Sequence, residues 1–311
     1  MRNDRFVSWG IFILLCIIWG SSFILMKASK DELTWAQIAS LRIFSAGIVM
    51  LPFAIFYFLK IPFKKMPLVI LSAICGNLFP AYLFAGAIAN NIDSSLAGIL
   101  NSLTPICVVV TGFVFFKSKI ETRKIIGVLI GFTGLTLLTL VGNKGISFEN
   151  VEYTVWILLA TILYGFNINI VSHYLRDINP VHLAFVSIAA MIIPTGIVLW
   201  QQNFLQLPFD DDLTLLAVIN SVLLGVAGTA IATALFYVLV KKAGGLFASL
   251  VTYGIPFVAL AWGFVFGETI TLLQIGCLMI ILCGVYLANL VDKKTISNQK
   301  FQFQNKPGTE A

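Results

Sequence analysis

Long, continuous apolar runs recur along this whole sequence. Each is long enough for a helix to cross a hydrocarbon core of about 30 Å, which takes ~20 residues. The runs do not alternate with a period of two, which argues against a transmembrane β-barrel. We therefore expect an all-α polytopic membrane protein with ten transmembrane helices, at residues 7–27, 35–58, 67–89, 93–116, 122–141, 151–173, 180–201, 212–239, 244–266 and 270–291.

Composition agrees with this fold class, because 59% of the 311 residues are hydrophobic and only 11% are charged. A soluble domain has about 25% charged residues, so this chain has too few of them to form a solvated surface. Five cysteines lie within apolar runs, without the spacing of a metal site or a disulfide framework. The apolar run after Arg2 and Arg5 is too long for a signal peptide and is predicted to be the first membrane helix.

Residues 94–135 and 243–288 share one pattern: an apolar run with a proline, a short polar break, then a glycine-spaced apolar run. Separations of 151, 151, 149 and 150 residues relate four pairs, Ala97 and Ala248, Pro105 and Pro256, Gly127 and Gly276, and Gly134 and Gly284. The pattern predicts a first repeat over residues 1–141 (helices 1–5) and a second over residues 142–291 (helices 6–10). Chance recurrence of glycine and proline in apolar helices is the alternative.

Because each repeat has an odd number of helices, five, the second repeat enters the membrane from the opposite side. Such inverted repeats commonly place a substrate site near the midplane, where the two halves meet. The segment Ile18-Trp19-Gly20-Ser21 in helix 1 has a weaker counterpart 145 residues later, Leu163-Tyr164-Gly165-Phe166 in helix 6.

Basic residues indicate the orientation, because cytoplasmic loops carry an excess of Lys and Arg. With the N-terminus inside, the inner segments hold 16 of the 20 basic residues, and the outer segments hold Lys27, Lys30 and Lys144. We therefore expect a multi-pass protein of the inner (plasma) membrane with both termini inside. The tail at residues 292–311 is polar and is predicted to be a disordered cytoplasmic segment. The net charge of +6 needs no nucleic-acid partner.

Several short motifs occur in a characteristic order: Trp19-Gly20-Ser21-Ser22-Phe23, Arg42, Ala248-Ser249-Leu250, Pro256, Gly267-Glu268, Gln274, Gly276 and Gly284. In these residues, and over essentially all of residues 8–291, the sequence resembles the EamA-like, ten-helix branch of the drug/metabolite transporter superfamily. The resemblance implies two inverted repeats around a central cavity, with helices 5 and 10 at the periphery. It also implies export or exchange of amino acids, other small metabolites or drug-like molecules.

The sequence departs from that family in two places. Lys117-Ser118-Lys119 stands where the family often has Gly-Glu after helix 4, so a carboxylate role in the first repeat is absent. Helix 1 has no acid, whereas small four-helix relatives use a glutamate there for proton-coupled export of cations.

Arg42 is the only charge well inside a predicted span. Such charges are costly and usually face a bundle interior or a water-filled cavity. We interpret Arg42 as a binding or gating group for a carboxylate or phosphate. The alternatives are donation to carbonyls of neighbouring helices and snorkelling to the outer surface.

Polar and aromatic residues at helical spacing predict the rest of a cavity lined by helices 1, 3, 4, 6, 8 and 9. For each amide, hydrogen bonding between helices is the alternative to a cavity role. The predicted substrate-binding residues are Trp19, Ser22, Arg42, Asn77, Phe84, Asn101, Tyr164, Asn167, Thr229, Phe236, Ser249 and Tyr253.

Three further groups of residues have simpler expectations. Pro105 and Pro256 lie within predicted spans and are expected to kink them, as hinges or only as packing features. Helix packing is expected of the glycines of helices 5 and 10, Gly127, Gly131, Gly134, Gly276 and Gly284. Glu268 and Asp93, at outer span ends, are interpreted as helix starts rather than proton-coupling acids.

These features predict a secondary transporter that exports or exchanges a small organic solute by alternating access. A membrane enzyme acting on a lipid or isoprenoid substrate is the alternative, although the acids do not form the cluster it needs. A passive channel is a third possibility. No Gly-rich phosphate loop, metal pair or nucleophile elbow occurs, so no cofactor, no metal and no ATP-driven step is expected. The expected partners are the solute and the lipid bilayer, and the expected state is a monomer.

Overall fold

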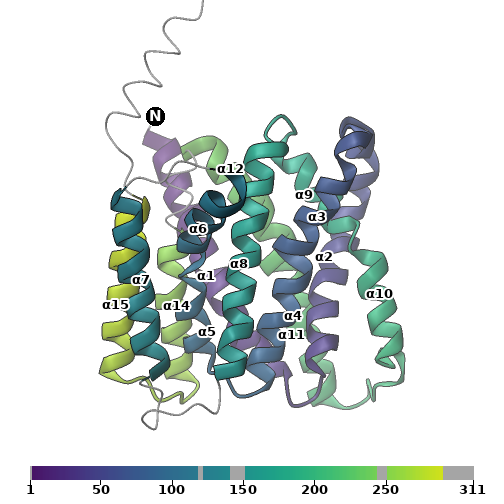
Figure 1. Ribbon diagram of the computed structural model, residues 1–311. Coiled ribbons are helices and arrows are strands. Elements are labelled where there is room, and N and C mark those ends of the chain that lie inside the picture. Colours follow the sequence, from purple (N-terminus) through teal and green to yellow (C-terminus); the bar gives the residue numbers. More distant parts are fainter. Residues whose placement is uncertain (1, 118–121, 141–150, 244–250, 290–311) are drawn as a thin grey trace, which may run out of the picture.

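The computed structural model of the chain is a bundle of helices lying roughly side by side (Figure 1). It describes residues 2–117, 122–140, 151–243 and 251–289, and these contain helices but no strands. Seven of the described helical segments are long and apolar enough to cross a membrane, and three shorter apolar helices accompany them. The expected fold class, an all-α polytopic membrane protein with ten spans, is confirmed.

In the first half, α1 (Arg2–Ser29) and α2 (Trp35–Tyr57) are continuous helices, and the next two spans are composite. The third span consists of α3 (Met66–Ala73), the π-helix η3 (Ile74–Leu78) and α4 (Phe79–Ala89). The fourth consists of α5 (Ser94–Asn101) and α6 (Thr104–Phe116), and α7 (Thr122–Leu140) is the fifth. The short 3₁₀ turns η1 (Phe58–Lys60) and η2 (Phe63–Lys65) connect the second span to the third.

The second half has the same plan. It begins with α8 (Val151–Tyr174), followed by the pair α9 (Pro180–Ala189) and α10 (Ile192–Gln201), and then the 3₁₀ turn η4 (Phe204–Gln206). The eighth span consists of α11 (Asp212–Gly225), the π-helix η5 (Val226–Ile231) and α12 (Ala232–Ala243). The last two described helices are α14 (Val251–Val265) and α15 (Leu272–Asn289).

Prolines explain two of the interruptions. Pro105 stands in the first turn of α6, where its missing N–H costs nothing, and the preceding span half ends at Asn101. Pro80 stands in the first turn of α4, directly after η3. Pro256, by contrast, lies inside the continuous helix α14. Equivalent prolines in the two repeats therefore have different local structures.

Glycine contacts show the internal symmetry of the bundle. A Cβ on Gly20 of α1 would lie 2.5 Å from the Cβ of Val258 in α14. A Cβ on Gly165 of α8 would lie 2.8 Å from the carbonyl oxygen of Cys107 in α6. Gly165 is 145 residues after Gly20, and Cys107 is 151 residues before Val258. The first and ninth spans therefore cross as closely as the sixth and fourth, as expected for inverted repeats.

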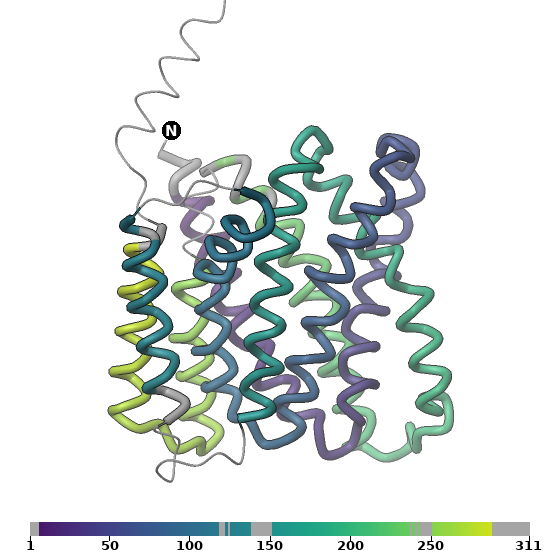
Figure 2. The backbone as a smooth tube through the Cα atoms, in the orientation of Figure 1, coloured from purple at the N-terminus to yellow at the C-terminus, as the bar shows by residue number. Residues whose placement is uncertain are grey.

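α7 and α15 form a pair at one edge of the bundle (Figure 2). A Cβ on Gly284 would clash with the backbone of Gly131 and would lie 2.6 Å from the carbonyl oxygen of Gly127. Small residues here allow two helix backbones to touch, which is the packing role expected of these glycines. The expectation was wrong for Gly276, which is exposed and has open space around it.

Candidate functional site

Arg42 contacts the π-helix η5 from the neighbouring helix α2. Its Nε donates a hydrogen bond of 3.1 Å to Oγ1 of Thr229. Arg42 lies seven residues after the start of α2, which is ~10 Å along the helix axis at 1.5 Å per residue. A Cβ on Gly225 would clash with the carbonyl of Arg42, so glycine at this position lets α2 approach the start of η5. The close approach positions Arg42 beside Thr229.

Tyr164 brings α8 to the same place, because it lies close enough to Arg42 for an electrostatic interaction. Its ring stacks on Phe84 of α4 with ring centroids 6.3 Å apart. Phe84 in turn packs against Phe23 of α1 at 5.6 Å. A row of aromatic rings thus leads from Arg42 to the first helix.

Trp19 of α1 contacts η5 from another side. Its indole Nε1 donates to the carbonyl oxygen of Gly228 at 2.9 Å, and its ring lies 5.5 Å from that of Phe236 in α12. Ser22 lies near Gly228 but donates to its own helix, at the carbonyl of Ile18. A π-helix shifts backbone hydrogen bonds out of the α-helical pattern and often marks a functional site. Trp19 satisfies one carbonyl of this irregular segment.

The two π-helices occupy equivalent places in the two repeats, η3 in the third span and η5 in the eighth. Asn167 of α8 packs against Gly76 of η3, as Ser22 of α1 packs against Gly228 of η5. Both pairs keep the repeat separation, since Gly228 follows Gly76 by 152 residues and Asn167 follows Ser22 by 145. Irregular backbone at membrane depth, at the interface of inverted repeats, is typical of transporter binding sites.

We use the term central cluster for the residues that these contacts join, which are Trp19, Phe23, Arg42, Phe84, Tyr164, Thr229 and Phe236. Most of them were expected from the sequence. Asn77 lies in η3 and is partly buried, and Tyr253 is partly buried in α14. Asn101 is at the end of α5, where its side-chain oxygen accepts from Thr104 at 3.4 Å. Ser249 lies outside the described residues.

Asn169 is a buried amide that the sequence interpretation missed. Its Nδ2 donates to the carbonyl of Val108, to Oγ1 of Thr111 and to the carbonyl of Gly165. These bonds join α8 to α6. Asn169 is thus the amide that forms hydrogen bonds between helices, whereas Asn167 lies against η3.

Glu268 is also placed differently from the expectation. It is 8% exposed, and α15 begins only at Leu272, so its interpretation as a helix start on the outer surface was wrong. Its carboxylate accepts from Nζ of Lys27 at 2.7 Å, from the backbone N–H and Oγ of Ser94 at 2.9 and 2.6 Å, and from the N–H of Ser95 at 3.0 Å. Glu268 therefore caps α5, a helix of the other repeat. Asp93, 3.5 Å from Lys27, completes this distal ion cluster.

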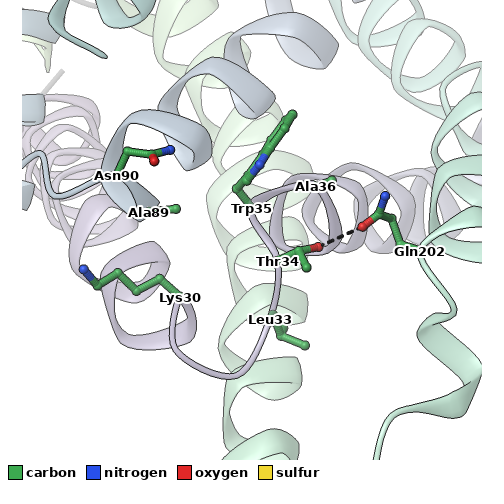
Figure 3. A pocket seen from close by; sticks show the side chains of 8 residues that line it. All are labelled: Lys30, Leu33, Thr34, Trp35, Ala36, Ala89, Asn90 and Gln202. Atoms are coloured by element: carbon green, nitrogen blue, oxygen red, sulfur yellow. Dashed lines mark hydrogen bonds between the residues drawn. The ribbon is translucent and has the colours of Figure 1, made fainter. Parts of the chain in front are cut away.

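A pocket of about 400 Å³ opens near the end of α1 and the start of α2 (Figure 3). The N-terminus lies at the opposite end of the bundle (Figure 1). The side chain of Thr34 donates to Oε1 of Gln202 at 3.2 Å, and the amide of Gln37 donates to the carbonyl of Gln202 at 3.0 Å. The Trp35 ring meets those of Tyr82 and Trp156 edge to face. The lining residues are Lys30, Leu33, Thr34, Trp35, Ala36, Ala89, Asn90 and Gln202.

The described residues contain no group of three or more His, Cys, Asp or Glu side chains that could hold a metal ion. The central cluster has one cation, hydroxyl groups and aromatic rings. Its chemistry suits noncovalent binding of a small solute.

Known proteins resemble this chain in both halves. Residues 8–140 and residues 153–290 each match the EamA-like transporter family. An uncharacterized transporter of Archaeoglobus fulgidus is 26% identical over 283 residues, which cover 90% of this chain and 97% of the relative. YedA of Escherichia coli K12, an uncharacterized inner membrane transporter, is 25% identical over 292 residues, covering 91% and 90%. A protein of known crystal structure shares the fold, with a TM-score of 0.60 and 17% identity over 95% of this chain and 98% of its own.

Proposed function

The chain belongs to the EamA-like transporter family, and from this premise we propose that it is a secondary transporter that exports or exchanges a small organic solute by alternating access. The observation that carries the proposal is the central cluster, in which Arg42 and Trp19 meet the π-helix of the eighth span. Sites of this kind, at irregular backbone between inverted repeats, are accessible from either side when one repeat rocks against the other.

The roles of the residues follow from their chemistry. Arg42 and Tyr164 supply polar contacts for the solute, and Trp19, Phe84 and Phe236 form an aromatic wall around its apolar part. Ser22, Asn77, Asn101, Asn167, Thr229, Ser249 and Tyr253 are proposed to add polar contacts in one or other state. The break at Pro105 and the interior Pro256 are proposed as hinges.

We place the protein in the inner membrane with both termini on the cytoplasmic side, as a monomer in contact with lipid. The basic distribution supports the orientation, since Lys60, Lys64, Lys65 and Arg176 lie at the same end of the bundle as the N-terminus. Reporter fusions at the C-terminus and after residue 205 test it. The expected result is cytoplasmic reporter activity only for the first and external activity only for the second.

Reconstitution into proteoliposomes tests the function directly. Vesicles preloaded with a labelled solute are assayed for release, with and without an unlabelled solute outside, over a panel of amino acids, organic acids and neutral metabolites. The proposal predicts saturable flux or exchange for at least one solute class, without ATP. It is wrong if no solute moves through protein that is correctly folded and inserted. Single-channel conductance without saturation would instead indicate a channel.

A further inference from the structure

We infer that the transported solute carries a carboxylate, which the guanidinium of Arg42 binds. The inference rests on the proposed transport function and adds the chemical class of the solute. It starts from the hydrogen bonding of Arg42. A guanidinium has five N–H donors, and in the described part of the chain Arg42 uses one, through Nε to Thr229.

The terminal nitrogens of Arg42 have no hydrogen-bond partner among the described residues. Among the described residues, every side-chain nitrogen or oxygen that is fully buried has a hydrogen-bond partner. The Nη nitrogens of Arg42 have none, so they keep some accessible surface, and Arg42 as a whole is partly buried. An arginine that served only to tie helices together would direct these donors at carbonyl oxygens of its neighbours. The Nη donors of Arg42 make no such bond among the described residues and remain available to a solute.

Among the residues that the structure describes, no acidic side chain pairs with Arg42. By sequence position, the 14 acidic residues of the chain lie outside the ten predicted spans or in their end turns. Ion pairs between described residues are found at the two ends of the bundle, where Lys27 pairs with Asp93 and Glu268 and Lys65 pairs with Asp177. A cation at this depth is costly unless it is paired, and the bidentate fork of arginine matches a carboxylate. A bound anion would therefore supply the negative charge that would pair with Arg42.

The surroundings favour a carboxylate over a phosphate. Arg42 is the only cation in the central part of the spans, so the site balances one negative charge rather than two. The Tyr164 hydroxyl adds one donor, and aromatic rings occupy the rest of the central cluster. A monocarboxylate with an apolar body, either a simple organic acid or an amino acid, fits this combination.

Matched pairs of solutes test the inference. Phenylacetate is compared with phenylacetamide, and leucine with leucinamide, for flux in proteoliposomes and for thermal stabilisation of the protein in lipid nanodiscs. We expect the acid of at least one pair to be transported and to raise the unfolding temperature, and its amide to do so at least roughly tenfold less effectively. Leucine and phenylacetate together distinguish an amino acid from a simple acid.

Variants of Arg42 complete the test. Arg42→Gln should reduce the response to the acid roughly tenfold or more, Arg42→Lys should have an intermediate effect, and Arg123→Gln, a control at the exposed end of α7, should have none. Equal handling of acid and amide, or an Arg42→Gln variant that responds like the wild type, overturns the inference. If Arg42→Gln does not fold, the wild-type comparison of acid with amide still decides. Flux confined to solutes without a carboxylate refutes the inference alone, whereas no flux of any solute refutes the transporter proposal as well.

Discussion

Nζ of Lys27 lies 2.7 Å from Oε1 of Glu268, although 241 residues separate them in the chain. Lys27 is in the last turn of α1, and Glu268 is in the turn between α14 and α15. The same carboxylate caps α5 through Ser94 and Ser95. One side chain of the second repeat therefore joins two spans of the first at the distal end of the bundle.

Glu268→Gln should destabilise the folded protein. The amide keeps the size of the side chain, but it loses the negative charge of the carboxylate, whose oxygens accept hydrogen bonds from Lys27, Ser94 and Ser95. Hydrogen bonds to a charged group are each worth about 1.5–3 kcal/mol, so we expect a loss of roughly 2–3 kcal/mol in unfolding free energy. Reversible unfolding in detergent measures it. Asp31→Asn, the corresponding acid-to-amide change at an exposed position, is the control and should change the stability little.

The contribution of Glu268 should depend on pH only in the acid range. Burial acts to raise the pKa of Glu268, but hydrogen bonds from Lys27, Ser94 and Ser95 outweigh it and lower the pKa from 4.5 to about 2. Because the folded pKa is the lower one, the stabilisation is fully present above about pH 4.5 and is lost as the pH falls towards 2. The stability difference between wild type and Glu268→Gln should thus be constant from about pH 5 to 8 and shrink below about 4.5.

A difference that varied between about pH 5 and 8 would contradict this assignment, because it would show that Glu268 titrates near neutral pH in the folded protein. Asp93 and Lys27 face Glu268 in the same cluster. Asp93→Asn is therefore measured in parallel, to separate the contribution of Asp93 from that of Glu268.

The sequence predicted the spans well because bilayer thickness sets the length of an apolar run, and the ten expected ranges match the described helices to within a few residues except where residues are not described. The π-helices η3 and η5 were not predicted, since one extra residue in a turn leaves the hydropathy of a span unchanged.

Contacts between distant residues account for the other differences. Glu268 follows a glycine with φ of +77° in a short polar break, which looks like a surface turn. Its burial depends on Lys27 and Ser94, whose proximity no local pattern encodes. Similarly, the spacing of glycines in α15 does not show which of them faces α7. Gly284 does and Gly276 does not, because Gly284 packs against the backbone of Gly131 whereas Gly276 lies on an exposed side of α15.

Gly284→Val should separate α7 from α15. Even a Cβ at this position meets the backbone of Gly131, which cannot move as a side chain can. We expect a loss of about 1–3 kcal/mol, and more if the pair separates completely. Gly276→Ala in the same helix is the matched control. It adds a Cβ in open space and should be neutral or stabilising by up to about 1 kcal/mol from helix propensity. Equal destabilisation by both changes would show that the helix itself, rather than its contact with α7, is sensitive.

Trp19→Phe should impair transport more than stability. The substitution keeps an aromatic ring beside Phe236 but removes the indole N–H that donates to the carbonyl of Gly228 in η5. A single neutral hydrogen bond contributes about 0.5–1.5 kcal/mol, so the protein should still fold. If η5 must hold its irregular backbone to position Thr229 against Arg42, the maximal flux should fall several-fold while the unfolding temperature changes little. The flux assay and thermal unfolding are run on the same preparation, with Trp9→Phe as the control because Trp9 is an exposed tryptophan of the same helix. Unchanged flux in Trp19→Phe would show that the bond from Trp19 is not needed to hold η5, and would leave the contact of Arg42 with Thr229 as the interaction that positions the segment.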